Sequence, residues 1–126
     1  MKSSVLIHMV DLDEKYGMLV KDYLAKHDFK KVSIFTDEKE CLSNMKMRPD
    51  ILITGYHLRN MSGLQLIKKA KSMFPSCYSI LLSGDFHKDT NHAFDERFIQ
   101  LVDKYIIKGM DDLEELMDAL VSNLDN

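Results

Sequence analysis

The sequence predicts a doubly wound α/β fold, in which helices cover both faces of a five-stranded parallel sheet. Short apolar runs alternate with helical patterns along the chain, and this alternation is typical of a parallel sheet. The 126 residues are 45% hydrophobic and 29% charged, which is enough apolar material to bury the core of one domain, residues 1–126. The predicted strands span residues 5–10, 31–35, 51–54, 79–82 and 105–107.

Five helices are expected between and after these strands, because apolar residues recur at the spacing of one helical face. The third helix is expected over 62–73, since Pro75 disfavours helix in the residue before it. The fourth is expected over 89–102, and the fifth opens with a capping-box-like pair, Asp111 and Glu114. Two apolar stripes mark the first and second helices: Tyr16, Leu19, Val20, Tyr23 and Leu24, then Cys41, Leu42 and Met45.

The composition argues against several classes of partner and site. A formal net charge of -3 does not provide the basic surface that nucleic-acid binding usually needs. The chain shows no secretory signal or long apolar segment, so we expect a cytoplasmic protein without a membrane anchor. Cys41 and Cys77 lack the spacing of a metal site, and the nine methionines are expected to fill the core.

Four residues are expected to meet at one edge of the sheet. Asp11, Gly55, Ser83 and Lys108 stand at the ends of the first, third, fourth and fifth predicted strands. The carboxyl ends of parallel strands share one edge, where open α/β sheets bind ligands and carry out chemistry. Gly55 brings no side chain to this edge.

These residues resemble the site of the receiver domain of two-component response regulators, of the chemotaxis-regulator type. The resemblance covers essentially the whole chain and rests on residues 5–14, 49–63, 79–84 and 105–108. It implies a flavodoxin-like sheet with strand order 2-1-3-4-5 and five helices. It also implies a role in phosphorelay signal transduction and not an enzyme activity.

In that family an acidic pair after the first strand and an aspartate after the third hold Mg²⁺, and the latter aspartate takes the phosphoryl group. By this resemblance, Ser83 would hydrogen-bond the phosphoryl group and Lys108 would neutralise part of its charge. Tyr105 matches the aromatic residue whose ring turns when the serine is drawn toward the phosphate.

Two substitutions remove acidic groups from this pattern. Leu12 stands where the family has its second acidic residue, and Gly55 stands where it has the phosphoacceptor. Asp11 is left alone, so we expect no metal site, with Mg²⁺ binding lost or weak. His57 matches a position that offers the metal one backbone carbonyl, and Asp13 could swing back to replace the lost ligand.

A further departure follows the fifth strand, where Gly109 replaces the usual proline after Lys108. A non-proline cis peptide costs about 2.5 to 4 kcal/mol, so a trans bond is expected here. The stretch from Ser83 to Tyr105 is also longer than usual, which predicts a reshaped fourth-helix region.

Purely structural roles compete with these assignments. Lys108 could pair with Asp11 or Asp13, because an unpaired buried charge is costly. Ser83 could be a strand-end hydroxyl bonded to the backbone, and Tyr105 a packed aromatic residue. His8, inside an apolar strand, is expected to be a hydrogen-bonded core histidine.

The preferred hypothesis is a degenerate pseudo-receiver that acts as a phosphorylation-independent protein-interaction module. A kinase, an effector or a second copy would bind the face formed by the fourth helix, the fifth strand and the fifth helix, or would bind the first helix. Two alternatives remain. The domain could be an active phosphoacceptor that uses Asp11 or Asp13 with Mg²⁺, or a sensor of a small anion held by Ser83 and Lys108.

Overall fold

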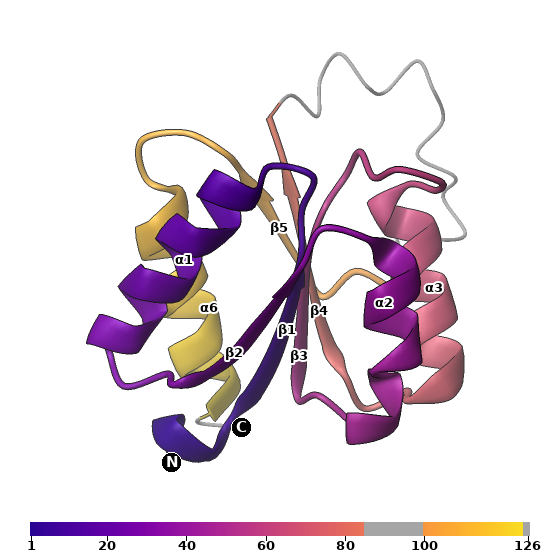
Figure 1. Cartoon of the computed structure of the whole chain (residues 1–126). Helices are drawn as coiled ribbons and strands as arrows, with labels where there is room; N and C mark the ends of the chain where they lie inside the picture. Colours follow the sequence, from indigo (N-terminus) through magenta and orange to yellow (C-terminus); the bar gives the residue numbers. More distant parts are fainter. Residues whose placement is uncertain (85–99, 125–126) are drawn as a thin grey trace.

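A parallel sheet between two helical layers forms the computed structural model, which describes residues 1–84 and 100–124 (Figure 1). The sheet has five strands in the order β2-β1-β3-β4-β5, so the predicted doubly wound fold is confirmed. All four strand pairings are parallel. The elements are η1 Lys2–Ser4, β1 Leu6–Val10, α1 Glu14–Lys26, β2 Lys31–Phe35, α2 Glu38–Ser43, η2 Met45–Met47, β3 Ile51–Gly55, α3 Gly63–Met73, β4 Tyr78–Ser83, β5 Lys104–Ile107 and α6 Asp112–Leu124.

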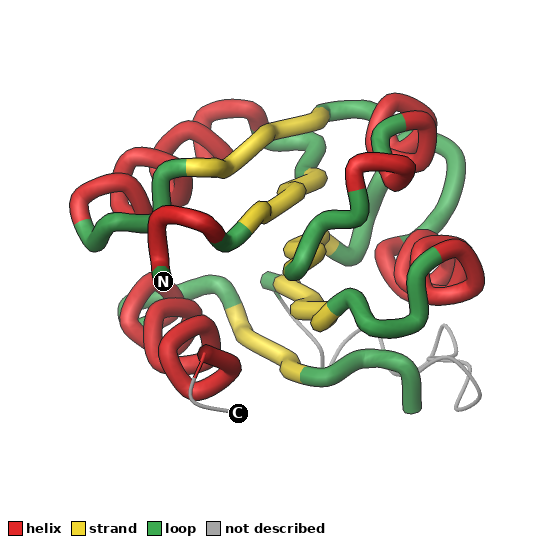
Figure 2. Tube along the Cα trace, turned by 90° about the horizontal axis from the view of Figure 1, so that it is seen from below, coloured by secondary structure: helices red, strands yellow, loops and turns green. Residues whose placement is uncertain are grey.

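The helices cover opposite faces of the sheet: α1 and α6 lie on one, and α2 and α3 on the other (Figures 1 and 2). Along β1, Ile7 and Met9 join the core cluster beneath α1 and α6, whereas Val10 joins the cluster beneath α2 and α3. Burial on both faces explains why the central strands are apolar almost throughout. None of the helices in the described residues is long and apolar enough to cross a membrane.

Local capping sets where two of the helices begin. The Asp13 side chain accepts a hydrogen bond from the Tyr16 backbone N–H at the start of α1. Ser62 and Gln65 form a reciprocal capping box at the start of α3, which therefore runs over Gly63–Met73 as predicted. The second helix is shorter than its apolar stripe indicated, because Met45 already belongs to η2.

The expectation of five helices is not matched, since the described residues contain four α-helices. The expected fourth helix, 89–102, lies mostly outside the described residues, and residues 100–102 are not helical. At this point the chain is already joining the sheet. The Ser79 hydroxyl donates to the Leu101 carbonyl oxygen at 2.7 Å, and the Asp103 backbone N–H donates to the Ser79 carbonyl oxygen at 3.0 Å.

The expectation that the methionines fill the core is wrong for most of them. Met9 and Met45 are buried. Five others are exposed: Met1, Met18, Met47, Met73 and Met110. Apolar character alone does not determine burial, because a flexible thioether is tolerated on both core and surface.

His8 is buried as predicted, but the expected hydrogen bonds are missing. Its side chain is 0% exposed, and neither ring nitrogen has a hydrogen-bond partner among the described residues. Its nearest ring is that of Phe35, edge to face at 5.2 Å between centroids. Because the site is apolar, burial lowers the pKa of His8 below its ordinary value of 6.5.

We expect the free energy of unfolding to fall on acidification below about pH 6.5, because the unfolded chain takes up a proton that buried His8 resists. A His8→Leu variant should lack this loss and gain about 1 kcal/mol near neutral pH, since an unsatisfied polar ring is removed. Urea unfolding at several pH values measures both effects. The matched control is His27→Gln at an exposed position, and an unchanged pH profile in His8→Leu would contradict the assignment.

Asp103 connects the end of α3 to the sheet. Its carboxylate should give the free energy of unfolding a second dependence on pH. Its Oδ2 accepts from Lys71 Nζ at 2.7 Å and from the Ser79 backbone N–H at 2.8 Å. Burial alone would raise the pKa of Asp103, but these hydrogen bonds and the Lys71 charge lower it below its ordinary value of 3.8.

The stabilisation by Asp103 should therefore be complete above its ordinary pKa and should disappear as acid protonates the folded carboxylate. An Asp103→Ala variant should lose about 1 to 2 kcal/mol at neutral pH, because the buried Ser79 N–H loses its acceptor. This variant should also lack the part of the acid-induced fall in unfolding free energy that protonation of Asp103 causes in the wild type. Asp22→Ala, at an exposed position on α1, is the control, and equal losses in both variants would argue against a specific role.

Candidate functional site

The carboxyl edge of the sheet brings together the residues predicted at the strand ends. Val10 pairs with Thr54, Gly55 with Leu82, and Ser83 with Ile107, so the positions after these strands line up across four strands. They surround a small pocket of about 200 Å³. The predicted residues that line it are Asp11, Leu12, Asp13, Gly55, Ser83 and Lys108, together with His57.

An ion pair between a buried carboxylate and a partly exposed lysine lies at this edge. Lys108 Nζ lies 2.9 Å from Asp11 Oδ2, so Asp11 is the partner chosen from the two that the sequence allowed. The Asp11 side chain is only 5% exposed and that of Lys108 is 28% exposed. Asp11 Oδ1 also accepts the Asp13 backbone N–H at 2.9 Å. The carboxylate is therefore satisfied on both oxygens.

Gly55 leaves room for this carboxylate. A Cβ atom built on Gly55 would lie 2.9 Å from Asp11 Oδ2 and 3.3 Å from Asp11 Cγ, so Asp11 occupies the space beside the missing side chain. Gly63, at the start of α3, is constrained from the other direction. A Cβ there would overlap the Gly55 carbonyl oxygen, which allows α3 to pack closely on the end of β3.

Tyr16 and Asp112 form a second layer that the sequence analysis did not identify as part of the site. Lys108 Nζ lies 4.3 Å from the centroid of the Tyr16 ring, within the range of a cation–π contact. The Tyr16 hydroxyl donates to Asp112 Oδ2 at 2.8 Å. Burial, followed by this hydrogen bond and the charges of Asp112 and Asp11, raises the pKa of Tyr16. In the sequence Tyr16 belongs to an apolar helical stripe, and no spacing rule pairs it with Asp112.

The remaining acidic group of the first loop is used in capping. Asp13 Oδ1 accepts the Tyr16 backbone N–H at 3.1 Å, while Leu12 between the two aspartates is exposed. In the described part of the chain, no three histidine, cysteine or carboxylate side chains are grouped as a metal site would require.

Two of the residues that the family resemblance assigns to phosphate recognition and the response to it, Ser83 and Tyr105, lie on the same face of the sheet, whereas Lys108 contacts Asp11 and the Tyr16 ring. Ser83 is buried at the end of β4, and Tyr105 is half-buried on β5 opposite Leu81, two residues before the position opposite Ser83. Tyr105 packs against the cluster beneath α2 and α3, and burial raises its pKa. The described residues contain no cis peptide, so the prediction of a trans bond between Lys108 and Gly109 is confirmed.

Comparisons with known proteins agree with this geometry. The family model of the response regulator receiver domain matches residues 7–121. A protein of Arabidopsis thaliana named as a two-component response regulator, ARR21, is 30% identical over a 93-residue alignment, with 70% of this chain and 15% of that protein covered. The chain thus spans a small part of the length of this relative.

Two solved structures share the fold at low sequence identity. A two-component response regulator from Clostridium difficile has a TM-score of 0.83 at 17% identity, with 98% of each chain covered. The response regulator TrrA from Thermotoga maritima, in complex with Mg²⁺ and beryllium fluoride, has a TM-score of 0.80 at 18% identity, covering 94% of this chain and 97% of TrrA. With the family model matching most of its length, this chain belongs to the response regulator receiver domain family.

Proposed function

We propose that this receiver domain acts in two-component signalling through protein contacts, without accepting a phosphoryl group at the usual position. The observation that carries the proposal is the Asp11 carboxylate, which lies against Gly55 and is paired with Lys108. The family's acceptor position has no carboxylate, and the neighbouring carboxylate is engaged by the lysine that would bind phosphate. A domain in this condition fits a binding module and not an enzyme.

The donor set also argues for weak or absent Mg²⁺ binding. Mg²⁺ requires several oxygen ligands in near-octahedral geometry. Asp11 is neutralised by Lys108, Asp13 caps α1, and Leu12 and Gly55 offer no carboxylate. The residues present do not fit this cation, and no step of the proposed function needs it.

The proposed partners are proteins: a kinase, an effector or a second copy of this chain. The proposed contact face contains β5 and α6, together with the expected fourth helix outside the described residues. Ser83, Tyr105 and Lys108 would support this face as fixed packing elements. We place the domain in the cytoplasm and treat residues 1–126 as one receiver unit.

One alternative has a specific observation in its favour. Asp11 occupies the space beside Gly55 and lies within reach of Lys108, so it is the carboxylate that a phosphodonor would meet. Phosphorylation of Asp11 would require Lys108 to release it. The same requirement applies to a small-anion sensor, because Lys108 would have to release Asp11 in order to bind the anion.

Incubation with Mg²⁺ and a small phosphodonor should leave the intact mass of the chain unchanged, because the acceptor carboxylate is missing. A receiver domain with the complete acidic set is the positive control under identical conditions. Stoichiometric, hydroxylamine-labile phosphorylation would overturn the proposal. Loss of that label in Asp11→Asn or Asp13→Asn would then establish the displaced acceptor.

Substitution of Lys108 tests how much the Asp11–Lys108 ion pair contributes to the free energy of unfolding. Lys108→Gln should cost about 2 to 3 kcal/mol of unfolding free energy, since it leaves a buried carboxylate uncompensated. Adding Asp11→Asn should recover part of this loss, because no net charge then remains buried. Urea denaturation measures all of these variants.

The matched control is Lys71→Gln, which breaks the pair with Asp103, whose side chain is 40% exposed. Its cost should be smaller, about 1 kcal/mol, because solvent screens the charge that is left behind. A cost at Lys108 no greater than that at Lys71 would show that the pair does not hold the edge together.

A further inference from the structure

One of the exposed methionines, Met73, lines a hollow between η2 and the end of α3. Met73 is 60% exposed, and the buried Met45 lines the same hollow. The hollow has a volume of about 550 Å³. Its main lining residues are Leu42, Met45, Lys46, Arg48, Met73 and Phe74. We call this hollow the methionine groove.

The groove lies at the amino edge of the sheet, opposite the ion-pair site. η2 leads into β3, and α3 ends shortly before β4, so both walls stand where strands begin. Arg48 ties the walls together, with its guanidinium carbon 4.9 Å from the centroid of the Phe74 ring. Arg48 holds a left-handed backbone conformation with φ 57° and donates its backbone N–H to the Met45 carbonyl oxygen. The groove therefore has a defined shape before any partner arrives.

The charge of the groove is opposite to that of the chain. Lys46 and Arg48 line it, and no carboxylate does so among the described residues, whereas the whole chain carries a formal charge of -3. A partner that places carboxylates beside these cations gains electrostatic complementarity.

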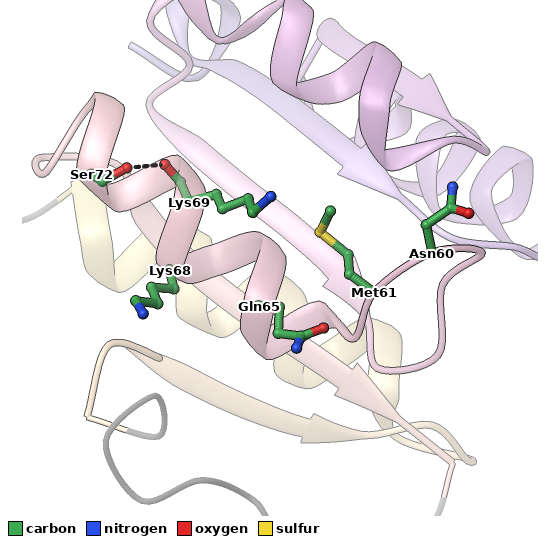
Figure 3. A pocket seen from close by; sticks show the side chains of 6 residues that line it. All are labelled: Asn60, Met61, Gln65, Lys68, Lys69 and Ser72. Atoms are coloured by element: carbon green, nitrogen blue, oxygen red, sulfur yellow. Dashed lines mark hydrogen bonds between the residues drawn. The ribbon is translucent and has the colours of Figure 1, made fainter.

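A neighbouring hollow of about 390 Å³ extends the basic surface along α3. Figure 3 shows that the Lys69 side chain reaches toward Met61, while Lys68 points away from it. Gln65, Asn60 and Ser72 complete the lining with amide and hydroxyl groups. The α3 surface thus offers apolar thioethers with basic and polar groups around them.

We infer that the methionine groove docks an acidic amphipathic helix of a partner protein. Leu42, Met73 and Phe74 would receive its apolar anchors, because flexible methionines adapt to the shape of a helix face. Lys46 and Arg48 would face the carboxylates that flank those anchors. This surface is additional to the contact face proposed above and does not depend on whether the carboxyl edge is phosphorylated.

A second copy of the chain fits this groove less well. The exposed carboxylates at the start of α6 (Asp111, Glu114 and Glu115) lie on a different surface from the groove. A second copy that used these carboxylates to bind the groove would therefore make a head-to-tail contact. Such a contact does not close into a symmetric dimer, and it would appear as concentration-dependent growth of oligomers.

The test uses a fluorescent synthetic helix with leucines at i, i+3, i+4 and i+7 and glutamates flanking them. Anisotropy titration with the whole chain should show saturable binding that weakens as salt is added. NMR amide shifts should map to η2 and the end of α3. The same peptide with lysines in place of glutamates should not bind.

Matched variants separate the groove from general surface effects. Met73→Glu and Lys46→Glu should each weaken peptide binding about tenfold, because they place negative charge among the anchors or at the basic rim. The controls are Met18→Glu and Lys15→Glu on α1, in the opposite helical layer. Thermal unfolding confirms that each variant is folded.

Three results would overturn the inference. The first is absence of binding by the acidic peptide, and the second is equal binding of the acidic and basic peptides. The third is an equal loss of binding in the α1 variants. Sedimentation velocity measures whether the chain forms oligomers. Oligomers that are present in the wild type and absent in Met73→Glu would assign the groove to a second copy of the chain instead.

Discussion

A buried carboxylate that must be neutralised organises the carboxyl edge of the sheet in this protein. Asp11 directly follows β1 inside the fold, and its two oxygens are satisfied by Lys108 and by the Asp13 backbone N–H. Lys108 is thereby held over the Tyr16 ring, whose hydroxyl reaches Asp112 on α6. One charge requirement thus connects β1, α1, β5 and α6. Gly55 places no side chain beside this carboxylate, and a Cβ atom there would lie 2.9 Å from Asp11 Oδ2.

This connection bears on how such a domain can signal. A switch needs two arrangements of similar free energy that a ligand or modification can bias. At this edge, the lysine that would bind a phosphoryl group already has a carboxylate partner inside the chain. This pairing is the ground for our proposal that the domain acts through protein contacts.

The two ends of the sheet differ in chemistry. The carboxyl edge contains the paired charges of Asp11 and Lys108 together with the Asp13 carboxylate. The amino edge beside α3 gathers Lys46 and Arg48 around exposed apolar side chains on a chain that is acidic overall. Charge separation of this kind orients a partner as it approaches, because local potentials steer association even when the net charge is small.

Local pattern alone determined a large part of this protein. The apolar runs located all five strands, Ser62 located the start of α3, and the strand ends placed Asp11, Gly55, Ser83 and Lys108 at one edge. These features depend on neighbouring residues and on the rule that parallel strands end together. The family resemblance followed from the same residues.

Only the tertiary structure decided which partners the buried and exposed groups find. It paired Lys108 with Asp11 while Asp13 capped α1, left the His8 nitrogens without hydrogen-bond partners among the described residues, and placed Met47 and Met73 on the surface. It also left residues 100–102 outside any helix, because Ser79 binds Leu101 and Asp103 at the sheet edge. Burial and pairing depend on segments far apart in the chain, and periodicity within one segment contains no information about them.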